Sequence, residues 1–232
     1  MASNSPKSYR DSEVRLKVAL PKGGLMGNVS QIINKVGFIV PGYDESSRIY
    51  RLIADKPHGV FVKVFSEKDI PVQVAVGNYD IGITGDDWVF ELTSKYRKIA
   101  IVKVLGLGFA NDSLYAVSAL GEDIESIRKK SEKRIVTIVS EYPNIAENFA
   151  RRSIFPNYRV LPVWGKATAY IPDGADIAII RVKSVGAEAE IEKMSLSPIS
   201  KIRESEATVI AYKESFETKD LSQILNFFKG ES

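Results

Sequence analysis

The sequence predicts an α/β protein with two similar lobes, each a mixed, mostly parallel sheet with flanking helices. Strand patterns alternate with amphipathic helix patterns along the chain, which is typical of parallel sheets. A strand that begins Tyr79-Asp-Ile-Gly-Ile83 has a counterpart, Ala175-Asp-Ile-Ala-Ile179, in the second half. One Asp-led strand in each half indicates two lobes with a cleft between them; the alternative is a chance match of two short apolar segments.

Composition limits the function classes. The chain has 232 residues, with 32 basic and 29 acidic side chains and a net charge of +3, and no long Lys/Arg run that would indicate nucleic-acid binding. It has no cysteine and one histidine, His58. This excludes a thiol nucleophile, a thiolate metal site and a histidine-rich metal centre, and allows a Ser-His-Asp triad only with His58 as its base.

The first residues are polar, and we expect residues 1–11 to form a disordered tail. They show no signal-peptide pattern, and no apolar run approaches the roughly 20 residues that span a bilayer. We therefore expect a cytoplasmic protein that does not bind membranes.

The amino-terminal segment reads as strand, glycine-rich turn and helix. Apolar residues alternate from Val14 to Leu20, and Pro21-Lys-Gly-Gly24 then interrupts the strand. Helical spacing follows from Leu25 to Val36, with Gly37 as a plausible end. The turn is either structural or an anion site made by backbone N–H groups and Lys22.

The remaining elements follow from the same patterns. Strands are predicted over residues 49–53, 60–65, 99–105, 114–117, 134–139, 158–163, 176–180 and 207–212. Helices are predicted over residues 72–76, 122–132, 145–150, 182–194 and 221–228, with Thr218 as the N-cap of the last.

The stretch Asp80-Ile-Gly-Ile-Thr-Gly-Asp-Asp87 joins a strand to a helix. Ligands of parallel α/β sheets bind at such junctions, where glycines allow a close approach of the backbone. The simpler interpretation is a tight turn in which Asp86 or Asp87 caps the helix.

Several motifs, taken together, resemble one enzyme family. They are Leu20-Pro-Lys-Gly-Gly-Leu25, Asp69-Ile-Pro71, Gly77, Asp80-Ile-Gly-Ile-Thr-Gly-Asp86, Leu107-Gly-Phe109 and Tyr142-Pro-Asn-Ile-Ala146. In this order they resemble ATP phosphoribosyltransferase, the first enzyme of histidine biosynthesis, in its short form without a carboxyl-terminal regulatory domain. The resemblance extends from Val14 to Phe228.

The resemblance implies a fold like that of type II periplasmic binding proteins. Residues 12–107 and 186–232 would form the first lobe, and residues 108–185 the second. A ring nitrogen of ATP's adenine would attack the anomeric carbon of phosphoribosyl pyrophosphate, and pyrophosphate would leave with Mg²⁺. A histidyl-tRNA-synthetase-like regulatory subunit and a homodimer are also implied.

The resemblance assigns substrate binding, with no residue acting as a covalent catalyst. The implied substrate-binding residues are Lys22, Gly23, Gly24, Asp69, Gly85, Asp86, Phe109, Tyr142, Asp176, Lys183, Ser184, Gly186 and Ala187.

The second lobe departs from the family pattern. The family's loop D-x-x-x-D-x-x-x-T-G-x-T-L begins here at Asp176, but the second acid is Ile180 and T-G-x-T becomes Ser184-Val-Gly-Ala187. Gly165-Lys-Ala-Thr168 stands where the family has Gly-Ser-x-Glu. In the first lobe, Gly24 replaces a usual arginine.

These departures remove anion-binding and hydroxyl-binding groups. Three cations in the affected region, Lys166, Arg181 and Lys183, either compensate or are ordinary surface charges. An alternative function is therefore a catalytically impaired homologue that binds a nucleotide or another small anion.

Overall fold

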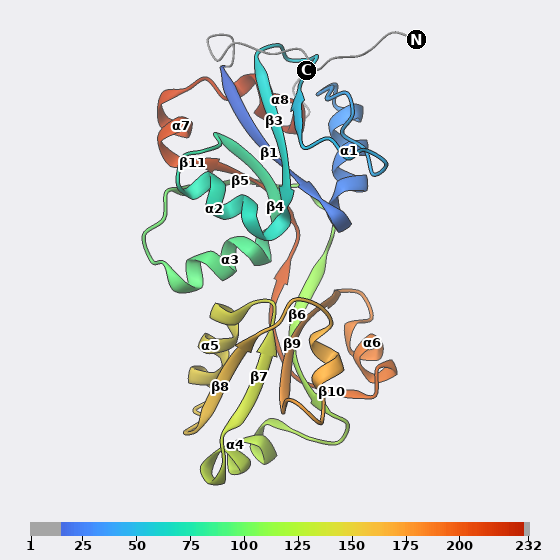
Figure 1. Cartoon of the computed structure of the whole chain (residues 1–232), viewed down its shortest axis with the longest axis vertical. Coiled ribbons are helices and arrows are strands. Elements are labelled where there is room, and N and C mark those ends of the chain that lie inside the picture. Colours follow the sequence, from blue (N-terminus) through green and yellow to red (C-terminus); the bar gives the residue numbers. More distant parts are fainter. Residues whose placement is uncertain (1–14, 230–232) are drawn as a thin grey trace. The chain divides into compact units, whose positions relative to one another are not determined.

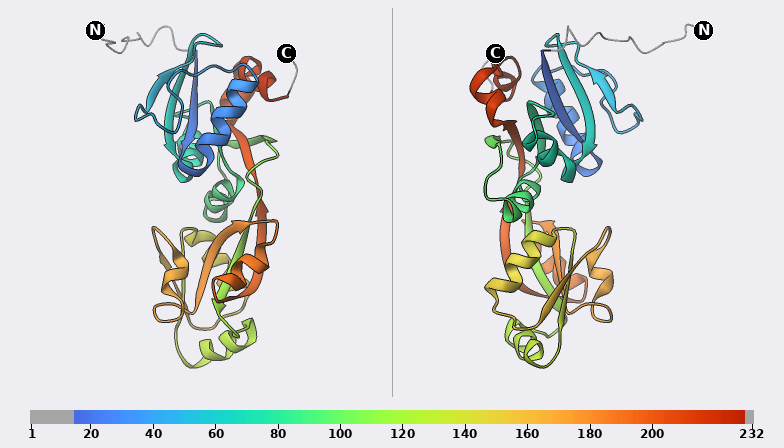
Figure 2. Two further views of the ribbon diagram at one scale, coloured as in Figure 1. Left: turned by 90° about the vertical axis from the view of Figure 1, so that its right-hand side faces the viewer. Right: turned by 60° about the vertical axis from the view of Figure 1, so that its left-hand side comes forward.

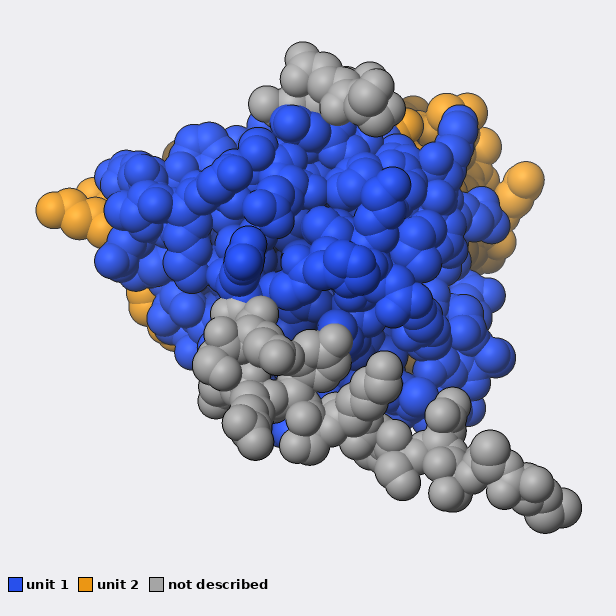
Figure 3. Space-filling view, turned by 90° about the horizontal axis from the view of Figure 1, so that it is seen from above, with its two compact units in different colours: residues 1–84, 100–107, 208–232 blue, residues 85–99, 108–207 orange. Residues whose placement is uncertain are grey.

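The computed structural model describes residues 15–229 and divides into two compact units. Unit 1 comprises the chain up to Thr84, Ala100–Leu107 and the chain from Thr208; unit 2 comprises Gly85–Ile99 and Gly108–Ala207 (Figure 3). Each unit contains one sheet of its own. No helix in the described part of the chain is long and apolar enough to cross a membrane.

Unit 1 is built on a six-stranded sheet of order β2-β3-β1-β4-β11-β5 (Figure 1). Its strands are β1 (Leu16–Lys22), β2 (Arg51–Ile53), β3 (Val60–Ser66), β4 (Ile81–Gly85), β5 (Ile101–Gly106) and β11 (Ala207–Tyr212). β1 runs parallel to β3 and β4, whereas β2 is antiparallel to β3 and β11 to β5. The helices are α1 (Met26–Lys35), α2 (Ile70–Ala75), α7 (Lys213–Thr218) and α8 (Ser222–Lys229).

Unit 2 is built on a five-stranded sheet of order β10-β6-β9-β7-β8. Its strands are β6 (Asp112–Ala119), β7 (Val136–Ser140), β8 (Tyr158–Pro162), β9 (Ile177–Lys183) and β10 (Leu196–Ser205). β7 is parallel to β8 and β9, and β6 is antiparallel to β9 and β10. The helices are α3 (Asp86–Lys95), α4 (Ile124–Lys133), α5 (Pro143–Arg152) and α6 (Ala187–Lys193).

Both faces of the unit 2 sheet are buried under helices (Figure 2). On one face, Ile138 and Ile177 pack with Phe149 of α5 and Ile127 of α4. On the other face, apolar side chains of β6 and β9 pack with Ile191 of α6. Successive side chains of a strand point to opposite faces, so apolar residues of β7 and β9 contribute to both cores: Ile138 and Ile177 on one face, Val139 and Ala178 on the other.

The Asp-led repeat corresponds to the same hydrogen-bond pattern in both units. Asp80 precedes β4; its N–H donates to the Lys17 carbonyl (2.9 Å) and its Oδ2 accepts from the Lys17 N–H (2.8 Å). Asp176 precedes β9 and makes the same two bonds with Thr137, each 2.9 Å long. In each case the carboxylate fixes the start of a strand against a parallel neighbour. The match is therefore a structural repeat and not a coincidence.

The order of strands repeats as well. The series β3-β1-β4-β11-β5 in unit 1 corresponds to β8-β7-β9-β6-β10 in unit 2. Each series has three parallel strands followed by two that form an antiparallel pair. The two similar lobes expected from the sequence thus share a sheet design.

Three local predictions are wrong. The helix predicted over 182–194 begins only at Ala187, because β9 continues to Lys183 and a turn follows. β10 was not predicted, since its sequence is polar and contains Pro198. Thr218 is the last residue of α7 rather than an N-cap; the Asp220 carboxylate instead accepts from the Ser222 N–H at 3.0 Å.

The unit boundaries also differ from the expected lobes. Residues 186–207, expected in the first lobe, lie in unit 2, because β10 pairs along its length with β6. Residues 85–99 also lie in unit 2, as α3 packs against α5. The tail predicted over 1–11 lies outside the described residues.

Candidate active site

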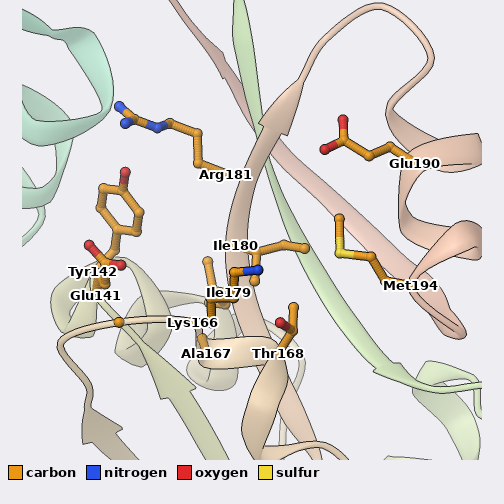
Figure 4. Close-up of a pocket in the computed structure, with 11 residues that line it drawn as sticks. Glu141, Tyr142, Lys166, Ala167, Thr168, Ile179, Ile180, Arg181, Glu190 and Met194 are labelled. Atoms are coloured by element: carbon orange, nitrogen blue, oxygen red, sulfur yellow. The ribbon is translucent and has the colours of Figure 1, made fainter. Parts of the chain in front are cut away.

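The cavity of interest lies in unit 2, where the parallel strands β7, β8 and β9 end. It has a volume of about 430 Å³. It is lined by Glu141, Tyr142, Gly165, Lys166, Ala167, Thr168, Ile179, Ile180, Arg181, Glu190 and Met194 (Figure 4). The carboxyl edge of a parallel sheet is where α/β proteins bind ligands, so the cavity is a candidate active site.

The turn between β7 and α5 forms one wall. The hydroxyl of Ser140 donates to the Ile179 carbonyl at 3.2 Å and accepts from the Tyr142 N–H at 2.9 Å. Pro143 then starts α5, at a helix position where a missing N–H costs nothing. This tight turn places Glu141 and Tyr142 beside the end of β9.

Tyr142 is the one cavity residue among the predicted substrate-binding residues. Its hydroxyl donates to Asp87 Oδ2 at 2.6 Å, and its ring lies 4.3 Å from that of Trp88, centroid to centroid. Burial, and then the neighbouring Asp87 carboxylate, raise the pKa of the Tyr142 phenol far above its usual range. The phenol therefore remains protonated and serves as a fixed donor to Asp87.

Gly85 ends β4 and is followed directly by Asp86 and Asp87 at the start of α3, and all three residues are buried. The α3 N-cap is Gly85, and neither aspartate caps the helix by its side chain, so that prediction is wrong. Asp86 is paired with Arg203. The fully buried Asp87 accepts from Tyr142, from Ser205 Oγ (3.2 Å) and from Arg181 Nη1 (3.3 Å).

Gly85 is required by its neighbours. A Cβ at this position would lie 2.1 Å from Asp87 Oδ1, and that carboxylate is held by the hydrogen bonds above. The glycine thus makes room for the Asp87 side chain of its own unit.

Glu91 joins α3 to α5 in the same unit. Its two carboxylate oxygens accept from the N–H groups of Asn144 and Ile145, each at 2.9 Å. These N–H groups lie in the first turn of α5 and have no partner within that helix. Burial raises the pKa of Glu91, although the two N–H donors act in the opposite direction.

Asp176 lies at the amino end of β9, at the opposite end of the strand from the cavity. Its carboxylate is bound to Arg134 and to the Thr137 N–H. Burial acts to raise the Asp176 pKa, but the hydrogen bonds from Arg134 and Thr137 outweigh it and hold the pKa below the usual range. The structure therefore gives Asp176 a role in strand register and does not bring it to the cavity.

The other predicted residues, at the end of β9 and after it, do not line the cavity either. Lys183 Nζ is paired with Asp112 Oδ1 at 2.8 Å, and the Ser184 hydroxyl lies 2.8 Å from that of Ser113. Gly186 has a φ of +74° and precedes α6, which begins at the buried Ala187. A left-handed residue in this turn favours glycine.

Four predicted residues lie in unit 1. Lys22, at the end of β1, is exposed, and its ammonium lies 5.4 Å from the centre of the Tyr50 ring. Gly23 has a φ of +80°, whereas Gly24 has an ordinary φ and room for a Cβ. Asp69 is exposed and makes no side-chain cap for α2.

Phe109 lies in unit 2, in the segment before β6. It is half-buried, and its carbonyl accepts from the Ala207 N–H at 2.9 Å. This is a backbone contact, so the structure does not bring its ring to the cavity lining.

Comparison with known proteins identifies the family. The sequence model of the HisG family, described as ATP phosphoribosyltransferase, matches residues 66–230. An ATP phosphoribosyltransferase of Metallosphaera sedula is 30% identical over 219 residues, covering 93% of this chain and 72% of that protein. The chain belongs to the ATP phosphoribosyltransferase family. It is a phosphoribosyltransferase of the first step of histidine biosynthesis, transferring phosphoribosyl to the adenine ring of ATP.

Solved structures agree with this fold. The ATP phosphoribosyl transferase (HisG:HisZ) complex from Thermotoga maritima has a chain that superposes with a TM-score of 0.75 at 18% identity, covering 94% of this chain and 98% of that chain. The ligand-binding component of an ABC-type import system from Staphylococcus aureus gives a TM-score of 0.51 at 10% identity, covering 93% and 72%. The predicted likeness to type II periplasmic binding proteins is confirmed.

A divalent metal is implied for an ATP phosphoribosyltransferase. Among residues 15–229, no group of three or more His, Asp or Glu side chains is placed to hold a metal ion. The single acids Glu141 and Glu190 lie in the cavity lining. The described residues therefore form no such group, and a divalent metal would enter with the diphosphate of the substrate.

The cavity contains residues that sequence reasoning missed. Glu141, Glu190 and Met194 were not singled out, although Lys166 and Arg181 were recognised as cations near the altered loop. One signal was present in the sequence: Glu190 and Met194 are four positions apart, so a helix places them on one face. The predicted helix began too early, and this face was not assigned to the end of β9.

Proposed function

We propose that the unit 2 cavity is where this ATP phosphoribosyltransferase binds phosphoribosyl pyrophosphate. The observation that carries the proposal is the cavity's position at the carboxyl ends of β7, β8 and β9, with Lys166 and Arg181 in its lining. Two cations suit a diphosphate, and about 430 Å³ falls within the usual range for small-molecule sites.

The proposed chemistry is positioning and electrostatic stabilisation. An adenine ring nitrogen of ATP attacks the anomeric carbon, the bond from that carbon to the diphosphate oxygen breaks, and magnesium-bound pyrophosphate leaves. Cations beside the diphosphate stabilise the negative charge that grows on the leaving group. No covalent enzyme intermediate is required, which suits a chain without cysteine.

Arg181 has a second role in this scheme. Its Nη1 lies 3.3 Å from Asp87 Oδ2, and its Nε lies 3.7 Å from Asp112 Oδ2. A guanidinium held between two carboxylates has a fixed position, which lowers the entropic cost of presenting it to a substrate. Its net electrostatic contribution is reduced by the same two acids.

Mg²⁺ as the metal, a regulatory partner and a cytoplasmic location complete the proposal. The T. maritima protein is a complex of HisG and HisZ. We propose that this chain also works with a second, regulatory subunit, that this subunit is histidyl-tRNA-synthetase-like, and that the chain itself forms a homodimer.

The activity is tested with the purified chain, ATP, phosphoribosyl pyrophosphate and Mg²⁺, with and without such a subunit. We expect release of pyrophosphate and formation of phosphoribosyl-ATP. If neither mixture reacts, thermal unfolding with phosphoribosyl pyrophosphate decides between the two functions, because a specific ligand stabilises the fold. A nucleotide that stabilises the protein while phosphoribosyl pyrophosphate does not would favour the binding module.

The location of the site is tested by filling the cavity. Thr168→Trp places a large side chain in the cavity lining, and we expect loss of phosphoribosyl pyrophosphate binding with an unchanged circular dichroism spectrum. Ala169→Trp is the matched control, since Ala169 is exposed in the same short 3-10 helix, Ala167–Tyr170, and does not line the cavity. Equal binding by both variants would place the substrate elsewhere.

A further inference from the structure

Polar side chains without partners converge on the cavity. Within residues 15–229, the side chains of Glu141, Lys166, Thr168 and Glu190 make no hydrogen bond or ion pair, although all four line it. Other charged side chains near β9 are paired, as Asp176 is with Arg134 and Lys183 with Asp112. Unpaired groups of both charge signs in one cavity suit a ligand that has both anionic and hydroxyl groups.

Glu190 lies on the same side of β9 as Ile180, which stands where the family pattern has its second aspartate. Ile180 packs against the apolar cluster that contains Ala187 and Ile191 of α6. Figure 4 shows Ile180, Glu190 and Met194 on the α6 side of β9, whereas Arg181 points toward Tyr142. A carboxylate on α6 is thus available on the side of the strand where residue 180 points.

The two cations of the cavity are not equivalent. Arg181 is held by Asp87 and Asp112 and lies toward Tyr142. Lys166 is exposed, has no carboxylate partner among residues 15–229, and lines the same cavity as Ile180. Its ammonium is a flexible point charge, which suits a diphosphate.

We propose that Glu190 is a specificity-determining residue that accepts hydrogen bonds from the ribose hydroxyls of phosphoribosyl pyrophosphate, and that Lys166 binds its diphosphate. The proposal rests on the proposed function of the cavity. A carboxylate at Glu190 on α6 takes the place of the strand acid that Ile180 has replaced, so the altered loop keeps a hydroxyl-binding group.

The test compares Glu190→Gln, Lys166→Gln and the control Glu192→Gln in the full chain. Glu192 is exposed on the same helix and does not line the cavity. Calorimetric affinities are measured for phosphoribosyl pyrophosphate, ribose 5-phosphate and magnesium pyrophosphate, together with the KM for each substrate. The second ligand contains the ribose diol without the diphosphate, and the third contains the diphosphate without the ribose.

We expect Glu190→Gln to lower the affinity for phosphoribosyl pyrophosphate about tenfold or more, which is the usual effect of losing hydrogen bonds to a charged group. The affinity for ribose 5-phosphate should fall by a similar factor, and the affinity for magnesium pyrophosphate should not change. Lys166→Gln should lower the affinities for both magnesium pyrophosphate and phosphoribosyl pyrophosphate. The KM for ATP and the affinities of Glu192→Gln should match the unchanged chain.

Two outcomes overturn the inference. An unchanged phosphoribosyl pyrophosphate affinity in Glu190→Gln shows that Glu190 does not contact the substrate. An equal loss for magnesium pyrophosphate shows that it acts on the metal-bound diphosphate instead of the ribose. Failure of the proposed function is a separate result, because the unchanged chain itself would then bind no phosphoribosyl pyrophosphate.

Discussion

The carboxyl ends of β4 and β9 differ, although both strands start with the same aspartate motif. After β4, Asp86 and Asp87 are buried in pairs with arginine, tyrosine and serine side chains. Beyond the parallel pairing of β9, a cavity is lined by Glu190 and Lys166, which have no such partners within residues 15–229. The repeat therefore preserves the start of the strand, which fixes register, and leaves the end free to serve structure in one case and ligand binding in the other.

The largest effect on stability is expected after β4, where the carboxylates are buried and paired. Asp87→Asn removes a fully buried charge that accepts from Tyr142, Ser205 and Arg181. Removing one partner of a buried ion pair costs about 3–5 kcal/mol. We therefore expect the free energy of unfolding, measured in urea, to fall by about 3 kcal/mol. Asp173→Asn, at an exposed acid of the same unit, should change it little. An equal loss in both variants would contradict the argument.

The next effect concerns the start of β4. Asp80→Asn weakens acceptance from the Lys17 N–H, from Ser215 Oγ (2.6 Å) and from Lys219 Nζ (2.7 Å). We expect the free energy of unfolding to fall by about 2–3 kcal/mol, since the side chain is buried and charge-assisted bonds are lost. The exposed Asp55 in the same unit provides the control variant Asp55→Asn.

The equivalent change before β9 should be milder. Asp176→Asn loses the pair with Arg134, whose side chain is 51% exposed, and keeps one acceptor for the Thr137 N–H. We expect a loss of about 1 kcal/mol, because solvent screens an exposed guanidinium. A double-mutant cycle with Arg134→Gln measures the pair. A loss larger than that of Asp80→Asn would reverse the proposed order of the two motifs.

The stability of the protein at low pH should depend on the same two carboxylates, Asp80 and Asp176. Hydrogen bonds from Lys219 and Ser215 hold the Asp80 pKa below its usual value against the effect of burial, and Asp176 is also lowered. A depressed pKa gives stability that is complete above the unfolded value of about 3.9 and is lost as pH falls through the folded value. Asp80→Asn should therefore lose less stability than the unchanged chain between about pH 5 and pH 2. Parallel curves would contradict this.

The smallest effect on stability is expected in the cavity. Glu190→Gln and Lys166→Gln remove charges that have no ion-pair partner among the described residues, so we expect the free energy of unfolding to change by less than about 0.5 kcal/mol. Thermal unfolding without ligand measures this. A clear loss of stability in either variant would show that the cavity side chains are structural, as Asp87 is.

Much of the fold was predictable because it depends on local patterns. Alternating and continuous apolar runs gave β1, β3 and β7, and helical spacing gave α1 with its left-handed Gly37 end. β10 escaped prediction because its burial depends on pairing with β6, more than seventy positions away. Edge strands with polar sequences have little local signal.

The candidate site was only partly predictable. Tyr142 lines the cavity, and Lys166 and Arg181 were recognised as charges of interest. Asp176 and Lys183 were assigned by their place in a family pattern, but the structure pairs them with Arg134 and Asp112. Whether a charged side chain meets a partner or a cavity depends on neighbours far away in the sequence.

The sequence alone determined the family, the α/β class and the two Asp-led strands, because ordered motifs and apolar periodicity are properties of the chain itself. Only the tertiary structure decided which carboxylates are used within the fold. Asp86 and Asp87 follow their strand just as a ligand-binding pair would, yet Arg203 and Arg181 approach them from other elements. In the described part of the chain no cation approaches Glu190 in this way, and because burying a charge without a partner is costly, it remains at the cavity.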